Sequence, residues 1–326
     1  MSRHDKNQTG IALMVVLWVM VLLMALATEF AFSMKMEVNT TRNYKEDIES
    51  YHLAKAGINL AMAEILKPAR FHAIHPEFGW ITGAPVSTAP QAGDVPEESA
   101  EASAEEFEHF ERDDIPFGNG TITYTITDEN GKIPINTVSR EILIKVLTLS
   151  GLEVGTERDV IADSILDWID SDDKHRLNGA EDEYYRTLFP PYQAKNSKFE
   201  TLDELLRVRG VTEEILYGAK EGDEEIYQGL DKFLTVYNVS GINPNTASEE
   251  ILPAFYSETQ VKDILEARAE KGYYSDFTSS HFRIKSTGKI EGSPTRHTIV
   301  AIVEKITEGK NDSLFIHYWN DNDLES

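Results

Sequence analysis

An uninterrupted apolar segment, residues 11–27, follows a short polar leader at the start of this 326-residue chain. The segment contains no charged residue, no Gly and no Pro. As a helix rising about 1.5 Å per residue it would span roughly 25 Å, which is close to the thickness of the hydrocarbon core of a bilayer. The leader carries Arg3 and Lys6, so we expect it to stay in the cytoplasm, with the rest of the chain across the membrane.

A secretory signal peptide is the alternative interpretation, because Ala25-Leu26-Ala27 would serve as a cleavage site. The chain continues without Gly or Pro as far as Ala56, however, and Pro68 is the first strong helix breaker. We therefore predict one retained helix of more than fifty residues, with its first third in lipid and its last third packed on a domain. Its apolar face, with residues every three or four positions, comprises Tyr44, Ile48, Tyr51, Ala54, Ile58, Ala61, Met62 and Ile65.

The leader and helix resemble the type IV pilin and pseudopilin superfamily, whose members lose a basic leader that ends in Gly. The resemblance implies cleavage by prepilin peptidase between Gly10 and Ile11, with methylation of the new N-terminus. Most members carry Glu at the fifth residue after the cut, where it is thought to neutralise the terminal amine of the preceding subunit. This chain has Val15 there. An apolar side chain cannot pair with an ammonium group, so the resemblance implies a subunit at the tip of a fibre.

Composition limits the remaining possibilities. A chain of this length with 41% hydrophobic residues has enough material beyond the membrane helix for two domains. The net charge of −25 opposes binding to nucleic acid and to anionic lipid. Because there is no Cys, the chain has neither disulfides nor thiolate metal sites.

Several patterns predict the soluble elements. Residues 121–127 alternate as a half-buried strand does, and residues 128–131 have the composition of a hairpin turn. Residues 84–106 are rich in Ala, Pro, Ser and Glu, which is typical of an acidic loop. Helical patterns cover 160–169 and 202–206, and strand patterns cover 233–237, 282–286, 298–303 and 314–319. The last three are expected to form an antiparallel sheet.

The chain contains an internal repeat. Residues 135–143 match residues 244–252 at Asn, Thr, Ser, Glu, Ile and Leu. Each copy is predicted to be a strand or turn that leads into a helix capped by Thr or Ser. Convergence between helix caps is the alternative, but six matches in nine residues favour a repeated helical unit.

The second copy also suggests a helix-hairpin-helix unit of the kind that grips nucleic-acid phosphates. Its expected hairpin, residues 256–259, has no Gly and carries Glu258 where phosphate would lie. Phosphate neutralisation by Lys and Arg supplies most nucleic-acid affinity. We therefore predict that the protein does not bind nucleic acid.

The densest group of charged side chains lies in residues 167–185. Asp170 and Asp172 have D-x-D spacing before an Asn-Gly turn, and Glu181 closes the loop from the other side. Crowded carboxylates repel one another unless a cation screens them, and Ca²⁺ takes six to eight oxygen ligands from flexible loops. The predicted structural Ca²⁺ site also includes Asp173, Asp182 and a backbone carbonyl near Leu177. It is not an EF-hand, and a solvated acidic loop is the alternative.

This acidic block, together with Pro190-Pro191-Tyr192, Lys195-Asn196 and residues 199–205, resembles the K minor pseudopilin family of the type II secretion system. The resemblance runs from the leader to the C-terminal sheet and includes Val15, the Trp-Ile-Asp-x-Asp…Gly-Ala-Glu motif and the Asn-Thr-Ala-Ser segment. It implies an α+β pseudopilin fold, in which a long N-terminal helix packs on an antiparallel sheet. It also implies a large inserted α-helical domain that binds Ca²⁺.

We expect five regions along the chain. Residues 1–10 form the cleaved leader and 11–34 the transmembrane part of the helix. Residues 35–135 form the first part of the pilin-like domain. Residues 136–280 form the inserted, mostly helical domain, interrupted by a strand near 233–237, and residues 281–326 supply the C-terminal strands.

The resemblance implies a single-pass protein of the bacterial inner membrane, with its soluble domains in the periplasm. It implies a tip complex with the minor pseudopilins I and J that initiates and caps the pseudopilus for export of folded proteins. Minor pseudopilin H and inner-membrane secretion components are further candidate partners. The alternative is a minor pilin of a type IV pilus or a DNA-uptake machine. We predict no catalytic residues, because the chain has neither H-E-x-x-H nor G-x-S-x-G.

Overall fold

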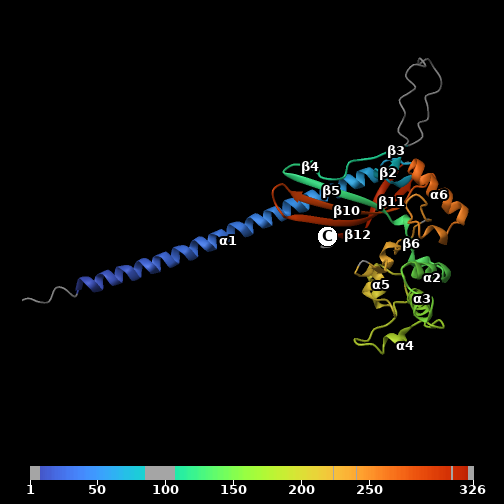
Figure 1. Ribbon diagram of the computed structural model, residues 1–326, viewed down its shortest axis with the longest axis horizontal. Coiled ribbons are helices and arrows are strands. Elements are labelled where there is room, and N and C mark those ends of the chain that lie inside the picture. Colours follow the sequence, from blue (N-terminus) through green and yellow to red (C-terminus); the bar gives the residue numbers. More distant parts are fainter. Residues whose placement is uncertain (1–7, 85–106, 223, 240, 310, 322–326) are drawn as a thin grey trace, which may run out of the picture.

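The computed structural model describes residues 8–84, 107–222, 224–239, 241–309 and 311–321 (Figure 1). Most of the predicted acidic loop, residues 85–106, lies outside these ranges.

A single helix, α1 (Gln8–Ile65), begins the described chain and runs for 58 residues. Figure 1 shows its N-terminal half extending alone, far from the rest of the protein. The last part of α1 packs on the sheet through a buried face of Leu53, Ala54, Ile58, Ala61 and Ile65. The prediction of one continuous helix is therefore confirmed. Tyr44 and Ile48 are exposed, so the packed face begins later than the apolar spacing indicated.

Two glycines let the helix lie directly on the sheet. A Cβ atom on Gly57 of α1 would come within 2.2 Å of the Ser286 Oγ atom. A Cβ atom on Gly288 would come within 2.2 Å of the carbonyl oxygen of Ser50. Any side chain at either position would push the helix away from the strand beneath it.

The main sheet has five antiparallel strands in the order β12-β11-β10-β5-β4. They are β4 (Ile115–Phe117), β5 (Gly120–Asp128), β10 (His281–Ile290), β11 (Arg296–Glu308) and β12 (Asn311–Asn320). The predicted strand at 121–127 and the three predicted C-terminal strands are thus confirmed. One face packs against α1 through Ile122, Ile126, Phe282, Ile284, Ile299, Ala301 and Val303. Side chains alternate between the two faces of a strand, so the residues between these point away from α1.

A second, smaller sheet follows α1. It consists of β1 (His72–His75), β2 (Gly79–Gly83) and the short β3 (Phe107–Glu108). Phe71, beside β1, is fully buried and stacks on Tyr273 with ring centroids 3.8 Å apart. The sequence patterns did not predict this sheet.

The segment between β5 and β10 has its own hydrophobic core, which includes Leu147, Ile165, Trp168, Tyr185 and Leu234. Its helices are α2 (Arg140–Leu149), α3 (Thr156–Ile169), α4 (Asp182–Tyr185), α5 (Glu213–Tyr217) and α6 (Glu258–Lys271). Its 3-10 helices include η3 (Ile135–Thr137), η4 (Leu202–Arg207), η5 (Leu230–Lys232) and η6 (Leu252–Ala254). Figure 1 places most of this segment beyond the end of the sheet that is far from the N-terminal half of α1. The exact limits at 136 and 280 stay a prediction.

The inserted segment contains more strands than expected. The short β9 (Leu234–Thr235) lies within the predicted strand and pairs in parallel with β6 (Ile133–Pro134). A hairpin of β7 (Ala219–Glu221) and β8 (Glu224–Tyr227) was not predicted. Its exposed, charged residues do not alternate with apolar ones, so period-two patterning could not reveal it.

The predicted hairpin turn at 128–131 is wrong. Residues Glu129–Gly131 form a buried 3-10 helix, η2, and the chain then leaves the sheet through β6. The side chain of Asp128 caps this helix by accepting from the Asn130 amide. Asp, Asn and Gly favour turns for local reasons, but here the polar side chains are held by distant parts of the protein.

The two copies of the repeat differ in their helices but share one structural role. Ser139 caps α2 in the first copy, as predicted. The predicted helix of the second copy is wrong: only the 3-10 helix η6 follows, because Pro253 cannot donate in a helix interior. The two Asn side chains nevertheless act alike. Asn136 donates to the carbonyl of Phe199 and accepts from its amide, and Asn245 does the same with Ser275.

Candidate functional site

The N-terminal helix carries the predicted processing and assembly positions. Gly10 and Ile11 lie in the backbone of α1, and Val15 follows one turn later with its side chain 56% exposed. In the described part of the chain, α1 is the one helix long and apolar enough to cross a membrane. The helix therefore has the properties of a membrane anchor. Cleavage between Gly10 and Ile11 stays a prediction.

The predicted Ca²⁺ ligands lie in the loop between α3 and α4. Aromatic packing fixes both ends of this loop, because Trp168 meets Tyr185 edge to face with ring centroids 5.2 Å apart. Asp167, which was not among the predicted ligands, is fully buried at the end of α3. Gly179 approaches it so closely that an added Cβ atom would lie 1.8 Å from the Asp167 Oδ2 atom. The loop is therefore built tightly around a carboxylate.

Arg176 is the cation that the chain itself supplies. Its guanidinium donates to Asp167 and to Asp170 at 2.5 Å each, and its backbone amide also donates to Asp167. Burial raises the pKa of Asp167 above its ordinary value despite these bonds. One guanidinium is thus shared between two carboxylates.

Glu181 is the least satisfied member of the group. The residue is 4% exposed, and both of its carboxylate oxygens are buried without a hydrogen-bond partner among the described residues. Burial, followed by repulsion from Asp167, Asp170, Asp173 and Asp172, raises the pKa of Glu181 to about 7. An ionised carboxylate in such a place needs a cation that the chain does not provide.

The remaining predicted ligands have partners of other kinds. The Asp172 carboxylate accepts from the Lys174 amide, and Asp173 accepts from Asn196. Asp182 accepts from Arg186, Gln193 and the Ala194 amide. Asp170, Asp172, Asp173 and Glu181 therefore gather at one loop, whereas the oxygens of Asp182 are already occupied.

A second buried carboxylate lies at the junction between the main sheet and the inserted segment. Asp128 ends β5 and accepts from Ser279 at 2.5 Å, Thr246 at 2.6 Å, Asn243 at 2.8 Å and the Asn130 amide at 2.8 Å. Burial raises the pKa of Asp128, although each of these bonds opposes the change. The three side-chain donors lie more than a hundred residues from Asp128 in the chain, so sequence spacing could not show them together.

The neighbouring Glu129 is buried as well. It accepts from Arg283 at 2.9 Å and from Thr235 at 2.5 Å. Burial alone would raise the pKa of Glu129, but the nearby Lys132 and Arg283 outweigh it and hold the pKa below its ordinary value. We call Asp128, Glu129 and their partners the polar junction. It joins β5 and β10 to the inserted segment.

Comparison with known proteins finds sequence relatives of one kind. The family model for type II secretion system protein K matches residues 124–239. Type II secretion system protein K of Pseudomonas aeruginosa is 25% identical over 87% of this chain and 80% of its own length. The putative type II secretion system protein K of Escherichia coli K12 is 22% identical over 82% of this chain and 77% of its own length.

A solved structure was also found. A chain in the crystal structure of the GspK-GspI-GspJ complex from the enterotoxigenic Escherichia coli type 2 secretion system has a TM-score of 0.46 at 17% identity. The similarity covers 64% of this chain and 82% of that chain.

A long apolar N-terminal helix packed on an antiparallel sheet is the arrangement that the sequence analysis expects of a pseudopilin. The matching relatives and the family model are of one kind. The chain is therefore similar to type II secretion system protein K, the name that the family model and both relatives carry.

Proposed function

We propose that this protein is the minor pseudopilin at the tip of the type II secretion pseudopilus, where it helps to initiate assembly and caps the fibre. The observation that carries the proposal is Val15, an exposed apolar side chain early in α1. It offers no carboxylate to the N-terminal amine of another subunit. A subunit without that contact is suited to the position above which no further subunit docks.

The inserted segment supports the same position. It lies beyond the end of the sheet, away from the membrane half of α1 (Figure 1). In a helical fibre whose first helices bundle together, the next subunit would have to occupy that space. We infer that the segment is accommodated at the end of a fibre and obstructs stacking within it.

Labelling of assembled fibres tests the tip position. Antibody against the inserted segment should mark one end of each pseudopilus, and overexpression of the chain alone should give no long homopolymer. Labelling along the length of the fibre would overturn the proposal.

Processing by prepilin peptidase is part of the proposal. We propose removal of residues 1–10, methylation of Ile11, and a single-pass orientation with the soluble parts in the periplasm. Gly10 and Ile11 lie in continuous helix at the start of the apolar segment, which supports it. N-terminal sequencing of the membrane form should begin at Ile11, whereas a start at Thr28 would indicate an ordinary signal peptide.

We propose the minor pseudopilins I and J as partners in a tip complex, with pseudopilin H and inner-membrane secretion components as further partners. The chain offers two surfaces for such subunits: the bare N-terminal half of α1, and the edge strand β12 with exposed Phe315, Ile316 and Tyr318. Solubilised membranes that contain all these pseudopilins should yield I and J together with this chain. Recovery of the chain alone would contradict the complex.

We further propose that the acidic loop binds structural Ca²⁺ through Asp170, Asp172, Asp173 and Glu181, with Asp167 supporting Arg176 beside it. Glu181 supports this proposal, because its carboxylate is buried among four Asp side chains without a hydrogen-bond donor. Oxygen-rich, flexible loops suit Ca²⁺. Elemental analysis of the purified full chain should find at least one tightly held Ca²⁺ ion; a chain without it would contradict the proposal.

A further inference from the structure

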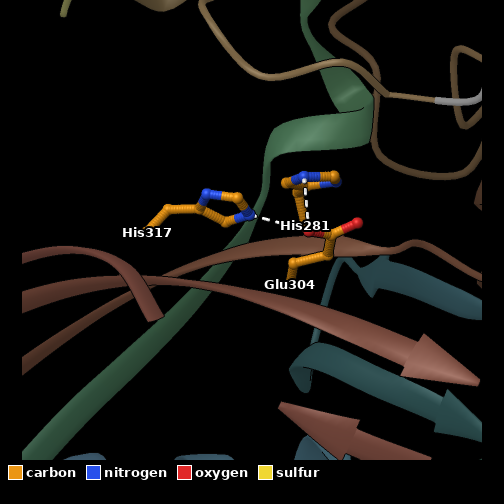
Figure 2. Close-up of side chains that lie close together, drawn as sticks. All are labelled: His281, Glu304 and His317. Atoms are coloured by element: carbon orange, nitrogen blue, oxygen red, sulfur yellow. Dashed lines mark hydrogen bonds and ion pairs between the residues drawn. The ribbon is translucent and has the colours of Figure 1, made fainter. Parts of the chain in front are cut away.

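Three metal-ligating side chains meet on the face of the main sheet that points away from α1 (Figure 2). They are His281 at the start of β10, Glu304 on β11 and His317 on β12. One ligand atom from each lies within 4.8 Å of the others. Among the residues that the structure describes, no other three His, Asp or Glu side chains meet this condition.

Strand register brings the three together. His281 and Glu304 are direct cross-strand partners. On the other side of β11, Val303 pairs with Ile316 but Ile302 pairs with Tyr318, so His317 is the extra residue of a β-bulge. Bulges commonly redirect a side chain and are frequent near functional sites. This bulge lies at the place where the side chain of His317 contacts Glu304.

The distances suit a single small ion. The His317 Nε2 atom lies 2.7 Å from the Glu304 Oε2 atom, and the His281 Nε2 atom lies 3.9 Å from the same oxygen. Ligands about 2.0–2.2 Å from a tetrahedral Zn²⁺ ion stand about 3.3 Å from one another. A shift of roughly half an ångström in each of these two contacts, together with closer approach of the two imidazole nitrogens from within 4.8 Å, would therefore admit the ion.

His281 also has a hydrogen-bond partner at its other ring nitrogen. The Nδ1 atom of His281 lies 2.9 Å from the Ser280 hydroxyl, which leaves its Nε2 atom directed at Glu304. Metal-binding His residues usually make such a bond through the other ring nitrogen. Tyr237, from the inserted segment, packs over both imidazoles with ring centroids 5.7 Å and 5.5 Å away. Nearby Arg283 is already paired with Glu129, so its charge is compensated.

We propose that His281, Glu304 and His317 form a binding site for a divalent transition metal of the Zn²⁺ type. Two imidazole nitrogens and one carboxylate match the ligand preference of Zn²⁺ and not the all-oxygen preference of Ca²⁺. His281 is almost completely buried, whereas Glu304 and His317 keep about a third of their side-chain surface exposed. The open side leaves room for water as the fourth ligand. The bound metal would tie edge strand β12 to β10 beneath the inserted segment.

The test uses the full chain in detergent, with a tag that contains no His and with saturating Ca²⁺ throughout, so that the acidic loop does not compete. Metal-free protein should bind one Zn²⁺ per chain, measured by competition with a chromophoric chelator. Loss of an outer-shell partner typically weakens metal binding 10- to 100-fold. We therefore expect about tenfold weaker binding in Ser280→Ala, and at least about 100-fold weaker binding in His317→Ala and Glu304→Gln.

His109→Ala is the matched control, because His109 is exposed and lies outside the cluster. It should bind Zn²⁺ as the unaltered chain does. Substoichiometric binding by the unaltered chain, or unchanged affinity in both ligand variants, would overturn the proposal. In that case the contact between His317 and Glu304 is a hydrogen bond and nothing more. Circular dichroism of each metal-free variant establishes that it is folded.

Discussion

The polar junction and the acidic loop both bury carboxylates, but they treat them in opposite ways. At the polar junction, Asp128 accepts four hydrogen bonds from three side chains and one backbone amide. In the acidic loop, Glu181 is comparably buried but has no hydrogen-bond donor among the described residues, and four Asp side chains repel it. The chain itself satisfies the first site, whereas the second would be satisfied by the cation that we propose.

The hydrogen-bond donors around a buried carboxylate indicate whether its role is structural or ligand-binding. Burial alone raises the pKa in both places. The two sites differ in what compensates the buried carboxylate. Hydrogen-bond donors that the fold holds in place give a carboxylate a structural role. Crowded carboxylates without such donors indicate a binding site for a cation. The stability of the junction should therefore be indifferent to Ca²⁺, and that of the loop should depend on it.

The largest effect is expected at the junction. Asp128→Ala would leave the hydroxyls of Ser279 and Thr246 and the amide of Asn243 buried without their acceptor. A buried neutral donor left without its acceptor costs about 1–3 kcal/mol, so three of them should together cost about 3 kcal/mol or more. Urea denaturation should show this loss equally in Ca²⁺ and in chelator. Asp113→Ala, which alters an exposed Asp, should stay within about 0.5 kcal/mol of the unaltered protein. A loss seen only in chelator would break the comparison.

Removal of Ca²⁺ should have the next largest effect. An ion that binds only the folded state adds about 2.7 kcal/mol at 100 times its dissociation constant. Thermal melts in Ca²⁺ and in chelator measure this difference. Glu181→Gln should lose most of it, yet it should be at least as stable as the unaltered chain in chelator, because the repulsion is gone.

Glu183→Gln is the matched control for Glu181, since it removes the same charge from an exposed side chain two residues away. It should keep the full Ca²⁺-dependent shift. Equal melting temperatures of the unaltered chain in Ca²⁺ and in chelator would mean that the cluster is a solvated acidic loop.

Acid should distinguish the two sites by a third effect, which is smaller than the others over a single pH unit. His72, at the junction, accepts from the Ser279 amide at 2.9 Å, and burial lowers its pKa to about 3 from an ordinary 6.5. Between these values the unfolded chain binds a proton that the folded chain does not. Stability is therefore lost as the pH falls below 6.5, by about 1.4 kcal/mol per pH unit.

His72→Asn keeps an acceptor near the Ser279 amide but removes the titrating ring. Its free energy of unfolding should fall less steeply with acid than that of the unaltered chain, whatever its stability at neutral pH. Denaturation at several pH values, with Ca²⁺ held saturating, measures the two slopes. Parallel slopes would show that His72 is not the group that makes the junction acid-sensitive.

Local patterns predicted the elements of this protein better than its buried polar contacts. The unbroken apolar spacing of α1 and the alternation of β5 were visible because each depends on neighbours within a few residues. The polar junction was mistaken for a hairpin turn, because Asp128 and Asn130 have turn composition and their partners lie far away in sequence. Clustered acids did locate the loop around Glu181. Asp167 was missed, since its role depends on the close approach of Gly179.

The smallest effect is expected at Asp182. It decides how far the set of Ca²⁺ ligands extends along the chain. The sequence places it among the ligands, yet its carboxylate already accepts from Arg186, Gln193 and the Ala194 amide. Arg186 is largely exposed, so loss of this ion pair in Asp182→Asn should cost less than about 1 kcal/mol. If the ion sits among Asp170, Asp172, Asp173 and Glu181, the variant should keep the Ca²⁺-dependent shift that Asp172→Ala loses. Loss of the shift in Asp182→Asn would instead show that Asp182 turns from Arg186 toward the ion, and that the ligand set extends as far as the sequence predicted.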